Sequence, residues 1–99
     1  MHARISTLEM EPARIDDMVG LAKEQIVPAL EQSDGFKGFT LMVDRQSGKG
    51  VGVSFWESAE ALQASEEVGN TTREQAGEAG GATGEPQVDR FEVVIDTMA

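Results

Sequence analysis

The stretch that decides the fold runs from residue 34 to residue 65 and reads DGFKGFTLMVDRQSGKGVGVSFWESAEALQAS. Two runs in it, residues 36–44 and 50–56, alternate their side chains with a period of two, which is typical of β-strands. The short segment between them contains Gly48, which suits the positive φ of a hairpin turn. Ser58 is a favourable N-cap for an alanine-rich segment that follows at once. The stretch therefore predicts a β-hairpin followed by a helix.

The two faces of these strands differ in kind. In the first strand, Phe39, Leu41 and Val43 share one face, and Thr40 and Met42 share the other. In the second strand, Val51, Val53 and Phe55 share one face, and Gly50, Gly52, Ser54 and Trp56 share the other. Small residues on that last face leave room for either a close-packed helix or a ligand.

Flanking segments complete the pattern. Before the hairpin we expect a strand over residues 3–10 and a helix over 13–32 that Pro28 kinks or ends. After it we expect a helix from Ser58 that stops at Gly69-Asn70, and then a short helix over 71–76. A mobile glycine-rich loop over 77–84 and a last strand over 88–96 follow. The order predicts an α+β, ferredoxin-like β-α-β-β-α-β fold with an antiparallel sheet. Both faces of the sheet are apolar, so we expect the face without helices to be buried against a second copy of the chain, giving a homodimer.

Composition sets the class of protein. Residues 1–99 are expected to form one domain. The net charge of −10 disfavours both nucleic acid and anionic membranes as partners. The sequence has no cysteine, no apolar run long enough to span a bilayer, and no apolar segment of a signal peptide near its first residue, so we expect a cytoplasmic protein.

Several short motifs carry a resemblance to a known family. They are Val27-Pro28-Ala29-Leu30, Gly35-Phe36-Lys37-Gly38-Phe39, Val43-Asp44-Arg45, Gly48-Lys49 and Trp56-Glu57-Ser58. In these motifs the chain resembles the antibiotic biosynthesis monooxygenase family of dimeric α/β barrels. The resemblance implies two sheets packed face to face across a dimer interface and a pocket between each sheet and its helices. It also implies oxidation of an anthrone-type aromatic by O₂ without a metal or flavin cofactor, in which the deprotonated substrate supplies the electron.

Haem-degrading members of the same fold use a different set of residues. They have a histidine ligand on the second helix, a tryptophan near it and an asparagine on the first strand. In this chain the only histidine is His2 and the only asparagine is Asn70, so the resemblance does not extend to haem chemistry, and we expect no cofactor and no metal site.

The candidate substrate-binding residues are Trp56, Asn70, Arg73 and Arg90. Trp56 either packs at the junction of sheet and helix or stacks on an aromatic ligand. Arg90 either pairs across strands or between subunits, or it contacts an anion. Arg4 has the same two interpretations with a weaker functional case. His2 is expected to be a solvated terminal residue, and Met10, Met18 and Met42 are expected to fill the core.

Two functions fit this sequence. The first is a cofactor-independent monooxygenase that acts on a small aromatic or quinol-like metabolite. The second is a barrel without catalytic activity that binds a small ligand or serves only as a structural dimer. They differ in whether the pocket between sheet and helices is open and lined by polar groups.

Overall fold

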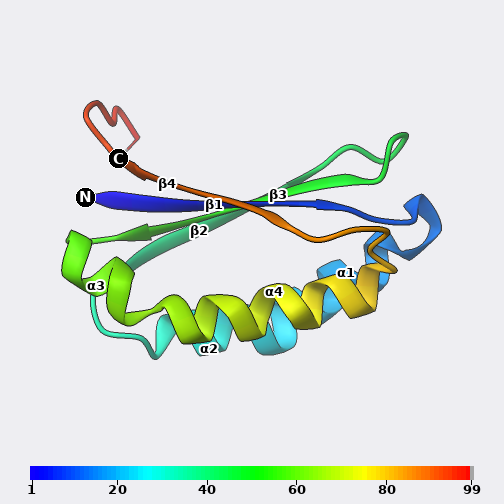
Figure 1. Cartoon of the computed structure of the whole chain (residues 1–99), viewed down its shortest axis with the longest axis horizontal. Helices are drawn as coiled ribbons and strands as arrows, with labels where there is room; N and C mark the ends of the chain where they lie inside the picture. Colours follow the sequence, from blue (N-terminus) through cyan, green and yellow to red (C-terminus); the bar gives the residue numbers. More distant parts are fainter. Residues whose placement is uncertain (99) are drawn as a thin grey trace.

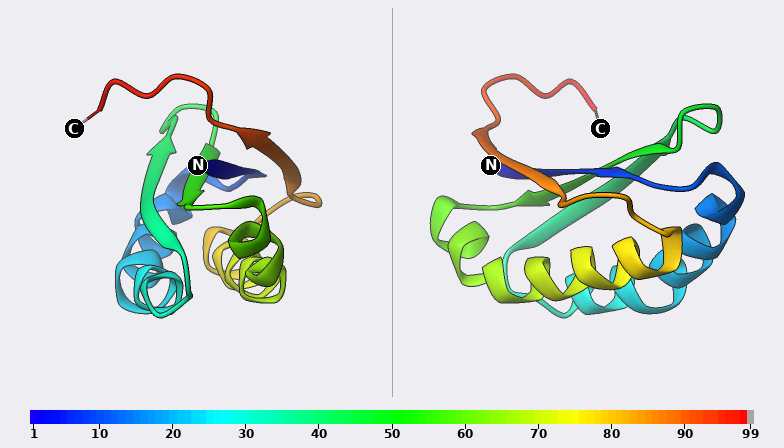
Figure 2. Two further views of the ribbon diagram at one scale, coloured as in Figure 1. Left: turned by 90° about the vertical axis from the view of Figure 1, so that its left-hand side faces the viewer. Right: turned by 45° about the vertical axis from the view of Figure 1, so that its right-hand side comes forward.

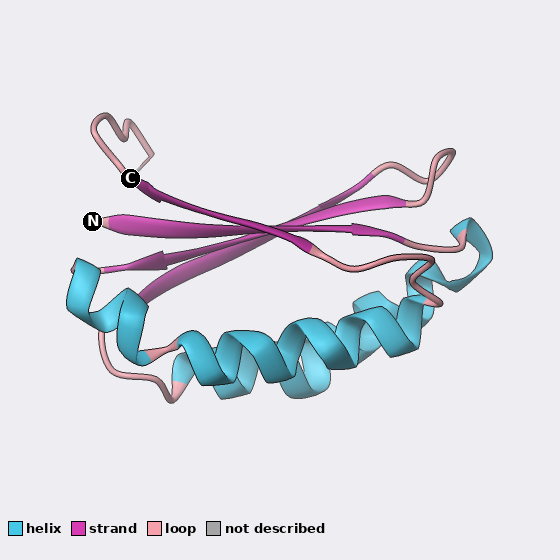
Figure 3. Cartoon of the chain, viewed as in Figure 1, coloured by secondary structure: helices cyan, strands magenta, loops and turns pink. Residues whose placement is uncertain are grey.

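The computed structural model describes residues 1–98 and has an α+β architecture (Figure 1). Its strands are β1 (His2–Glu9), β2 (Phe36–Val43), β3 (Lys49–Trp56) and β4 (Gln87–Glu92), and its main helices are α1 (Ile15–Leu21), α2 (Val27–Glu31), α3 (Ala59–Ala64) and α4 (Glu66–Gly80). The strands form one antiparallel sheet in the order β2-β3-β1-β4 (Figure 3). This order confirms the predicted ferredoxin-like fold.

All helices lie on one face of the sheet. The α1–α2 segment and helix α4 run side by side beneath the strands, and the opposite face of the sheet carries no helix (Figure 2). The predicted faces of the hairpin are confirmed, since Phe39, Leu41 and Val43 pack on the core beneath the sheet while Thr40 and Met42 are exposed on the other side. Among residues 1–98, no helix has the length and apolar character needed to cross a membrane.

The first helical segment changes its geometry just before Pro28. Residues Ala22–Ile26 form a π-helical turn in which the Val27 N–H donates to the Ala22 carbonyl. Proline has no N–H to donate, and its ring crowds the carbonyl four residues earlier. A wider turn ahead of Pro28 accommodates that crowding, and the helix then continues to Glu31. Pro28 therefore alters the helix without ending it.

The β2–β3 hairpin is fixed by its turn. The Asp44 side chain accepts hydrogen bonds from the Gln46 N–H (2.9 Å) and the Ser47 N–H (3.3 Å), and these bonds lower the pKa of its carboxyl. Gly48 has a φ of 86°, and a Cβ there would lie 2.0 Å from the Met10 carbonyl oxygen. Glycine is required at this position for both reasons.

Three predicted boundaries are wrong. Helix α4 runs without a break through Gly69-Asn70, where a stop was predicted, and it includes residues 77–80 of the predicted loop. A glycine inside a helix costs only about 1 kcal/mol, and packing of α4 along the sheet outweighs that cost. Strand β4 ends at Glu92 instead of residue 96. Glu92 pairs with His2, and one further hydrogen bond runs from the Val93 N–H to the Met1 carbonyl (2.8 Å).

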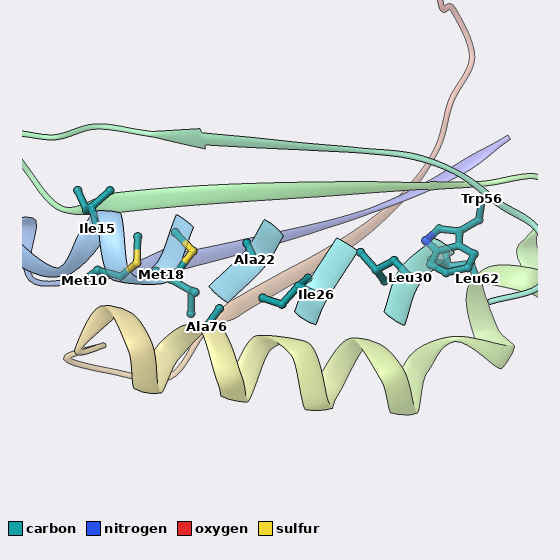
Figure 4. Packing of buried hydrophobic residues seen from close by; sticks show 10 residues of the cluster. Met10, Ile15, Met18, Ala22, Ile26, Leu30, Trp56, Leu62 and Ala76 are labelled. Carbon is teal, nitrogen blue, oxygen red and sulfur yellow. The ribbon is translucent and has the colours of Figure 1, made fainter. Parts of the chain in front are cut away.

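The core lies between the sheet and the helices. Figure 4 shows Trp56 beside Leu62 at one end and Met10 and Met18 at the other. The core positions of Met10 and Met18 are confirmed, with 4% and 1% of their surfaces exposed. Met42 was placed wrongly in the core, because it is 51% exposed on the open face of the sheet.

Candidate functional site

A cavity of about 60 Å³ lies between the sheet and the helices, where the sequence predicts a pocket. Its walls are mainly apolar and include Leu8, Met10, Met18, Ala22, Ile26, Leu30, Phe39, Leu41 and Ala76. The polar groups that line it are Arg4, Ser6, Ser54, Thr72 and Arg73. The two arginines are its only charged lining residues, so the cavity is an apolar space with positive charge at one part of its wall.

The space arises from the inner face of β3. Gly50, Gly52 and Ser54 lie in the cavity wall, and Trp56, the next residue on that face, is fully buried outside it. The side chains on this face therefore increase in size along the strand, from the two glycines to the indole of Trp56. The cavity occupies the half of the strand that has little side-chain volume.

The π-helical turn forms part of the opposite wall. Ala22 and Ile26 are the first and last residues of that turn, and both line the cavity. Turns of this kind occur frequently at functional sites, because they shift the side chains of a helix relative to its regular register.

Arg73 lies inside the protein without a carboxylate partner. Its side chain is 9% exposed, and its guanidinium donates to the Ser6 hydroxyl (3.5 Å) and to the Asn70 side-chain oxygen. Burial, and then the neighbouring charge of Arg4, lowers the pKa of the Arg73 guanidinium. In the part of the chain that the structure describes, no carboxylate lies within ion-pair distance of it. Arg73 is therefore a buried cation held by neutral oxygens.

Arg4 is buried more deeply, at 2% exposure. Its Nη2 donates to the Leu62 carbonyl (2.9 Å), the Ser65 hydroxyl (3.0 Å) and the Glu66 carboxylate (2.6 Å). Its Cζ lies 5.9 Å from the ring centroid of Trp56. Its Nε–H has no hydrogen-bond partner among the described residues. Nη2 of this guanidinium is fully bonded, and the Nε–H on the same edge has no acceptor in residues 1–98.

Glu66 joins two strands to the start of α4. It accepts from Arg4 of β1 and from Nε of Arg90 of β4 at 3.0 Å. Hydrogen bonding to Arg90, and then to Arg4, lowers the pKa of the Glu66 carboxyl to about 2. The carboxylate is therefore charged over the whole physiological range and fixes Arg4 in place.

The structure separates the four predicted substrate-binding residues. Arg73 lines the cavity, and Asn70 holds its guanidinium. Trp56 packs edge-on against Phe36 (5.5 Å between ring centroids), and its indole N–H donates to Ser54, so its ring belongs to the core next to the cavity. Arg90 lies outside the cavity, paired with Glu66.

Sequence reasoning gave too little weight to Arg4, which lines the cavity. Arg4 and Leu8 share one face of the strand, and this pattern could have predicted that Arg4 faces the core. His2 was also misplaced: it lies in strand β1 opposite Trp56, and its Nδ1 is buried.

A second, open depression shares two lining residues with the cavity. This groove of about 590 Å³ lies between α4 and the segment that follows it, and Leu8 and Arg73 line both spaces. Asn70 and Glu74 of α4 and Pro86 lie in the groove wall. Arg73 therefore lines both the cavity and the open groove.

The cavity lining offers no ligand set for a haem or a metal ion. Residues 1–98 contain no group of three or more His, Cys, Asp or Glu side chains that could hold a metal ion. His2 does not line the cavity.

Sequence comparison identifies relatives of unassigned activity. No family model matches the chain. It is 37% identical over 93 residues to the uncharacterised protein Rv2557 of Mycobacterium tuberculosis, covering 94% of this chain and 41% of that protein. It is 38% identical over 76 residues to Rv2558 of the same organism, covering 77% of this chain and 32% of that protein. The chain thus spans less than half the length of these curated relatives.

Solved structures are similar over almost the whole chain. A monooxygenase from the gene ActVA-Orf6 of Streptomyces coelicolor, solved with nanaomycin D, is 19% identical with a TM-score of 0.78, covering 99% of this chain and 91% of that one. The haem degrader MhuD of Mycobacterium tuberculosis, solved with two haems in its active site, is 29% identical with a TM-score of 0.74, covering 99% of this chain and 100% of that one. The resemblance seen in the sequence is confirmed at the level of architecture, and this chain has the fold of the antibiotic biosynthesis monooxygenase family.

Proposed function

We propose that this protein is a cofactor-independent monooxygenase that oxidises a small aromatic, quinol-like metabolite in the cavity between the sheet and the helices. The observation that carries the proposal is an apolar cavity whose only charged lining groups are the guanidinium groups of Arg4 and Arg73. Such a site takes an apolar ring and favours the ionised form of a hydroxyl group on it. Two proteins with this fold support the same reaction class: one is the ActVA-Orf6 monooxygenase, and the other is SnoaB, a cofactor-independent oxygenase from Streptomyces nogalater.

In this proposal the substrate itself supplies the electrons, and the lining residues only bind and stabilise it. Arginine does not accept a proton near neutral pH, so neither ionisable lining group acts as a base. Arg73 instead stabilises the anion that forms when the substrate loses a proton to water. The electron-rich anion then reduces O₂. For an anthrone, the CH₂ group becomes C=O, one oxygen atom enters the product and the other leaves as water, so no external reductant is needed. Without a placed base we expect slow turnover.

A ring enters only if the cavity widens. The space of about 60 Å³ is less than half of the roughly 150 Å³ that holds benzene. Met10 and Met18 line it, and their unbranched side chains change rotamer at low cost. The open groove beyond Arg73 gives the ring a route inward.

Oxygen uptake with a panel of anthrones and hydroquinones tests the reaction. We expect one O₂ consumed per product formed, and we expect Arg73→Gln to lower kcat/KM by about tenfold or more. Arg45→Gln is the matched control, because it removes the same charge from an exposed ion pair with Asp16. Activity that survives Arg73→Gln in a folded protein would show that the reaction takes place elsewhere.

A barrel without catalytic activity that binds a small ligand is the second candidate. The lack of a proton-accepting group among the residues that line the cavity favours it. Saturable ligand binding without oxygen uptake for any compound in the panel would establish this alternative.

The proposal includes a cytoplasmic location, in keeping with a sequence without cysteine. It also includes a homodimer formed through the open face of the sheet. Phe91 of β4 is 54% exposed on that face and Met42 of β2 is 51% exposed, so a second copy would remove much apolar surface from water. Analytical ultracentrifugation at micromolar concentration is expected to find a dimer, and Phe91→Asp to produce monomers. Thr83→Asp adds the same charge in the segment after α4 and should leave the dimer intact.

A further inference from the structure

Charge is unbalanced where β1, β4 and α4 meet. Three arginines, Arg4, Arg73 and Arg90, lie around one carboxylate, that of Glu66. Glu66 is already bonded to Arg4 and Arg90, so the guanidinium of Arg73 is left with the neutral oxygens of Ser6 and Asn70. The whole chain carries a net charge of −10, so this positive cluster is opposite in sign to the protein around it. A buried charge without a counter-ion is costly, and an anionic ligand would remove that cost.

The two guanidinium groups in the cavity wall meet over a single glycine. A Cβ built on Gly69 would lie 2.8 Å from Arg4 Nη1 and 3.3 Å from Arg73 Nη1. Both groups therefore approach the same point on α4, and any larger residue there would push them apart. The Nε–H of Arg4, which is 98% buried with the rest of its side chain, has no acceptor among the described residues, so the hydrogen bonding of this guanidinium is also incomplete.

We propose that Arg4 and Arg73 together bind the carboxylate of a small organic acid whose apolar body lies in the cavity between the sheet and the helices. This assignment rests on the proposed function in one respect, since it names the substrate class of the same site. A carboxylate has two acceptor oxygens, and guanidinium groups match it in geometry as well as in charge. Beyond the arginines the wall is formed by side chains such as Leu8, Met18 and Phe39, which suit a hydrocarbon body.

A permanent anion compensates the charge of Arg73 before any reaction begins. A phenolate is charged only after the substrate loses its proton, whereas Arg73 is buried and charged before any ligand arrives. A carboxylic acid is already ionised at neutral pH, so its binding compensates the cluster in the resting protein. Arg73 also lines the open groove, so the carboxylate reaches a guanidinium before the apolar body enters the cavity.

Calorimetric titration with benzoate and with benzamide, at constant ionic strength, tests the assignment. The two compounds have almost the same shape and differ in charge. We expect benzoate to bind wild-type protein about tenfold or more tightly than benzamide, and Arg73→Gln to lower benzoate affinity by about tenfold to hundredfold while changing benzamide affinity by less than about twofold. Arg73→Lys keeps the charge and should retain part of the preference. Arg45→Gln should behave as wild type, and circular dichroism shows whether each variant is folded.

Equal affinity for benzoate and benzamide would overturn the proposal, as would a benzoate preference that survives Arg73→Gln. No saturable benzoate binding at about 10 mM would also overturn it. The outcome is independent of the reaction, because binding is measured without O₂ uptake. If benzoate preference depends on Arg73 but no quinol is oxidised, the anion site stands and the monooxygenase proposal fails. If a neutral quinol is oxidised and benzoate does not bind, the monooxygenase proposal stands and the anion site fails.

Discussion

The two ends of the inner face of β3 have opposite properties. At one end Trp56 is completely buried, packs edge-on against Phe36 and donates its indole N–H to Ser54. At the other end Gly50 and Gly52 contribute no side chains; both line the cavity, with the Met10 methyl group and the Phe39 ring packed against them. The same strand therefore stabilises the fold with one half and provides room for a ligand with the other. The comparison teaches that stability and binding are separable along this strand.

Arg4 connects the two ends. Its guanidinium lies near the ring of Trp56 and also lines the cavity. Changes at the Trp56 end should therefore affect stability first, changes at the glycine end should affect binding first, and changes around Arg4 should affect both.

Trp56→Ala should have the largest effect. Removing a fully buried indole leaves a void, so we expect the free energy of unfolding to fall by about 3–5 kcal/mol, measured by urea denaturation. Trp56→Phe fills most of the space and should cost less. A Trp56→Ala protein of unchanged stability that no longer binds ligand would break the comparison, since Trp56 would then belong to the binding half.

Ser54→Ala removes the acceptor of the Trp56 indole N–H, a hydrogen bond of 2.9 Å. A buried donor without a partner costs about 1–3 kcal/mol, and urea denaturation should register a loss in that range. Phenylalanine has no such donor, so in a Trp56→Phe background the same substitution should cost almost nothing. An equal loss in both backgrounds would mean that Ser54 acts through the cavity wall instead.

Glu66→Gln tests the link through Arg4 and should show itself in the pH dependence of stability. The folded-state pKa of Glu66 is about 2, below its ordinary value of 4.5, so the ion pairs contribute fully above pH 4.5 and their contribution is lost as the pH falls towards 2. Because the side chain is 31% exposed, we expect a loss of about 1–2 kcal/mol at neutral pH.

Urea denaturation between pH 2 and pH 6 is the measurement, and the variant should lose less stability than wild type as the pH falls from 4.5 to 2. Glu67→Gln, an exposed neighbour on α4, is the matched control. Identical pH profiles for wild type and Glu66→Gln would contradict the assigned ion pairs.

Gly52→Ala should have the smallest effect on stability and a clear effect on binding. A Cβ there would lie 3.3 Å from the Phe39 ring, which is close but tolerable after a small shift. We expect the free energy of unfolding to change by less than about 1 kcal/mol and the affinity for benzoate to fall, because the methyl group reduces the cavity. Wild-type affinity with a smaller cavity would show that ligands bind in the outer groove.

Much of the architecture was predictable, because local patterns decided it. The period-two alternation gave the correct faces of β2 and β3, Gly48 gave the turn, and the Ser58 hydroxyl caps α3 by accepting from the Ala61 N–H. Errors occurred where packing outweighs local preference. Gly69 reads as a helix stop in the sequence, yet it is the point at which α4 approaches Arg4.

The candidate site was predictable only in part. Arg73 and Asn70 were placed near a pocket on the glycine-rich face of β3, and Arg73 lines the cavity there while Asn70 bonds to it. From the sequence, Arg4 had the same two interpretations as Arg90 and a weaker functional case. Nothing local reveals that Glu66, far away in sequence, neutralises it.

The sequence by itself determined the order of the elements, which side chains share a face of each strand and the absence of cysteine and tyrosine from residues 1–99, since these depend on residue type and on periods of two and 3.6. The tertiary structure decided which charges meet. The Glu66 carboxylate pairs with Arg4 and Arg90, and Arg73 lines the cavity without a carboxylate partner among the described residues. This happens because β1, β4 and α4 meet in the fold although they lie far apart in the chain.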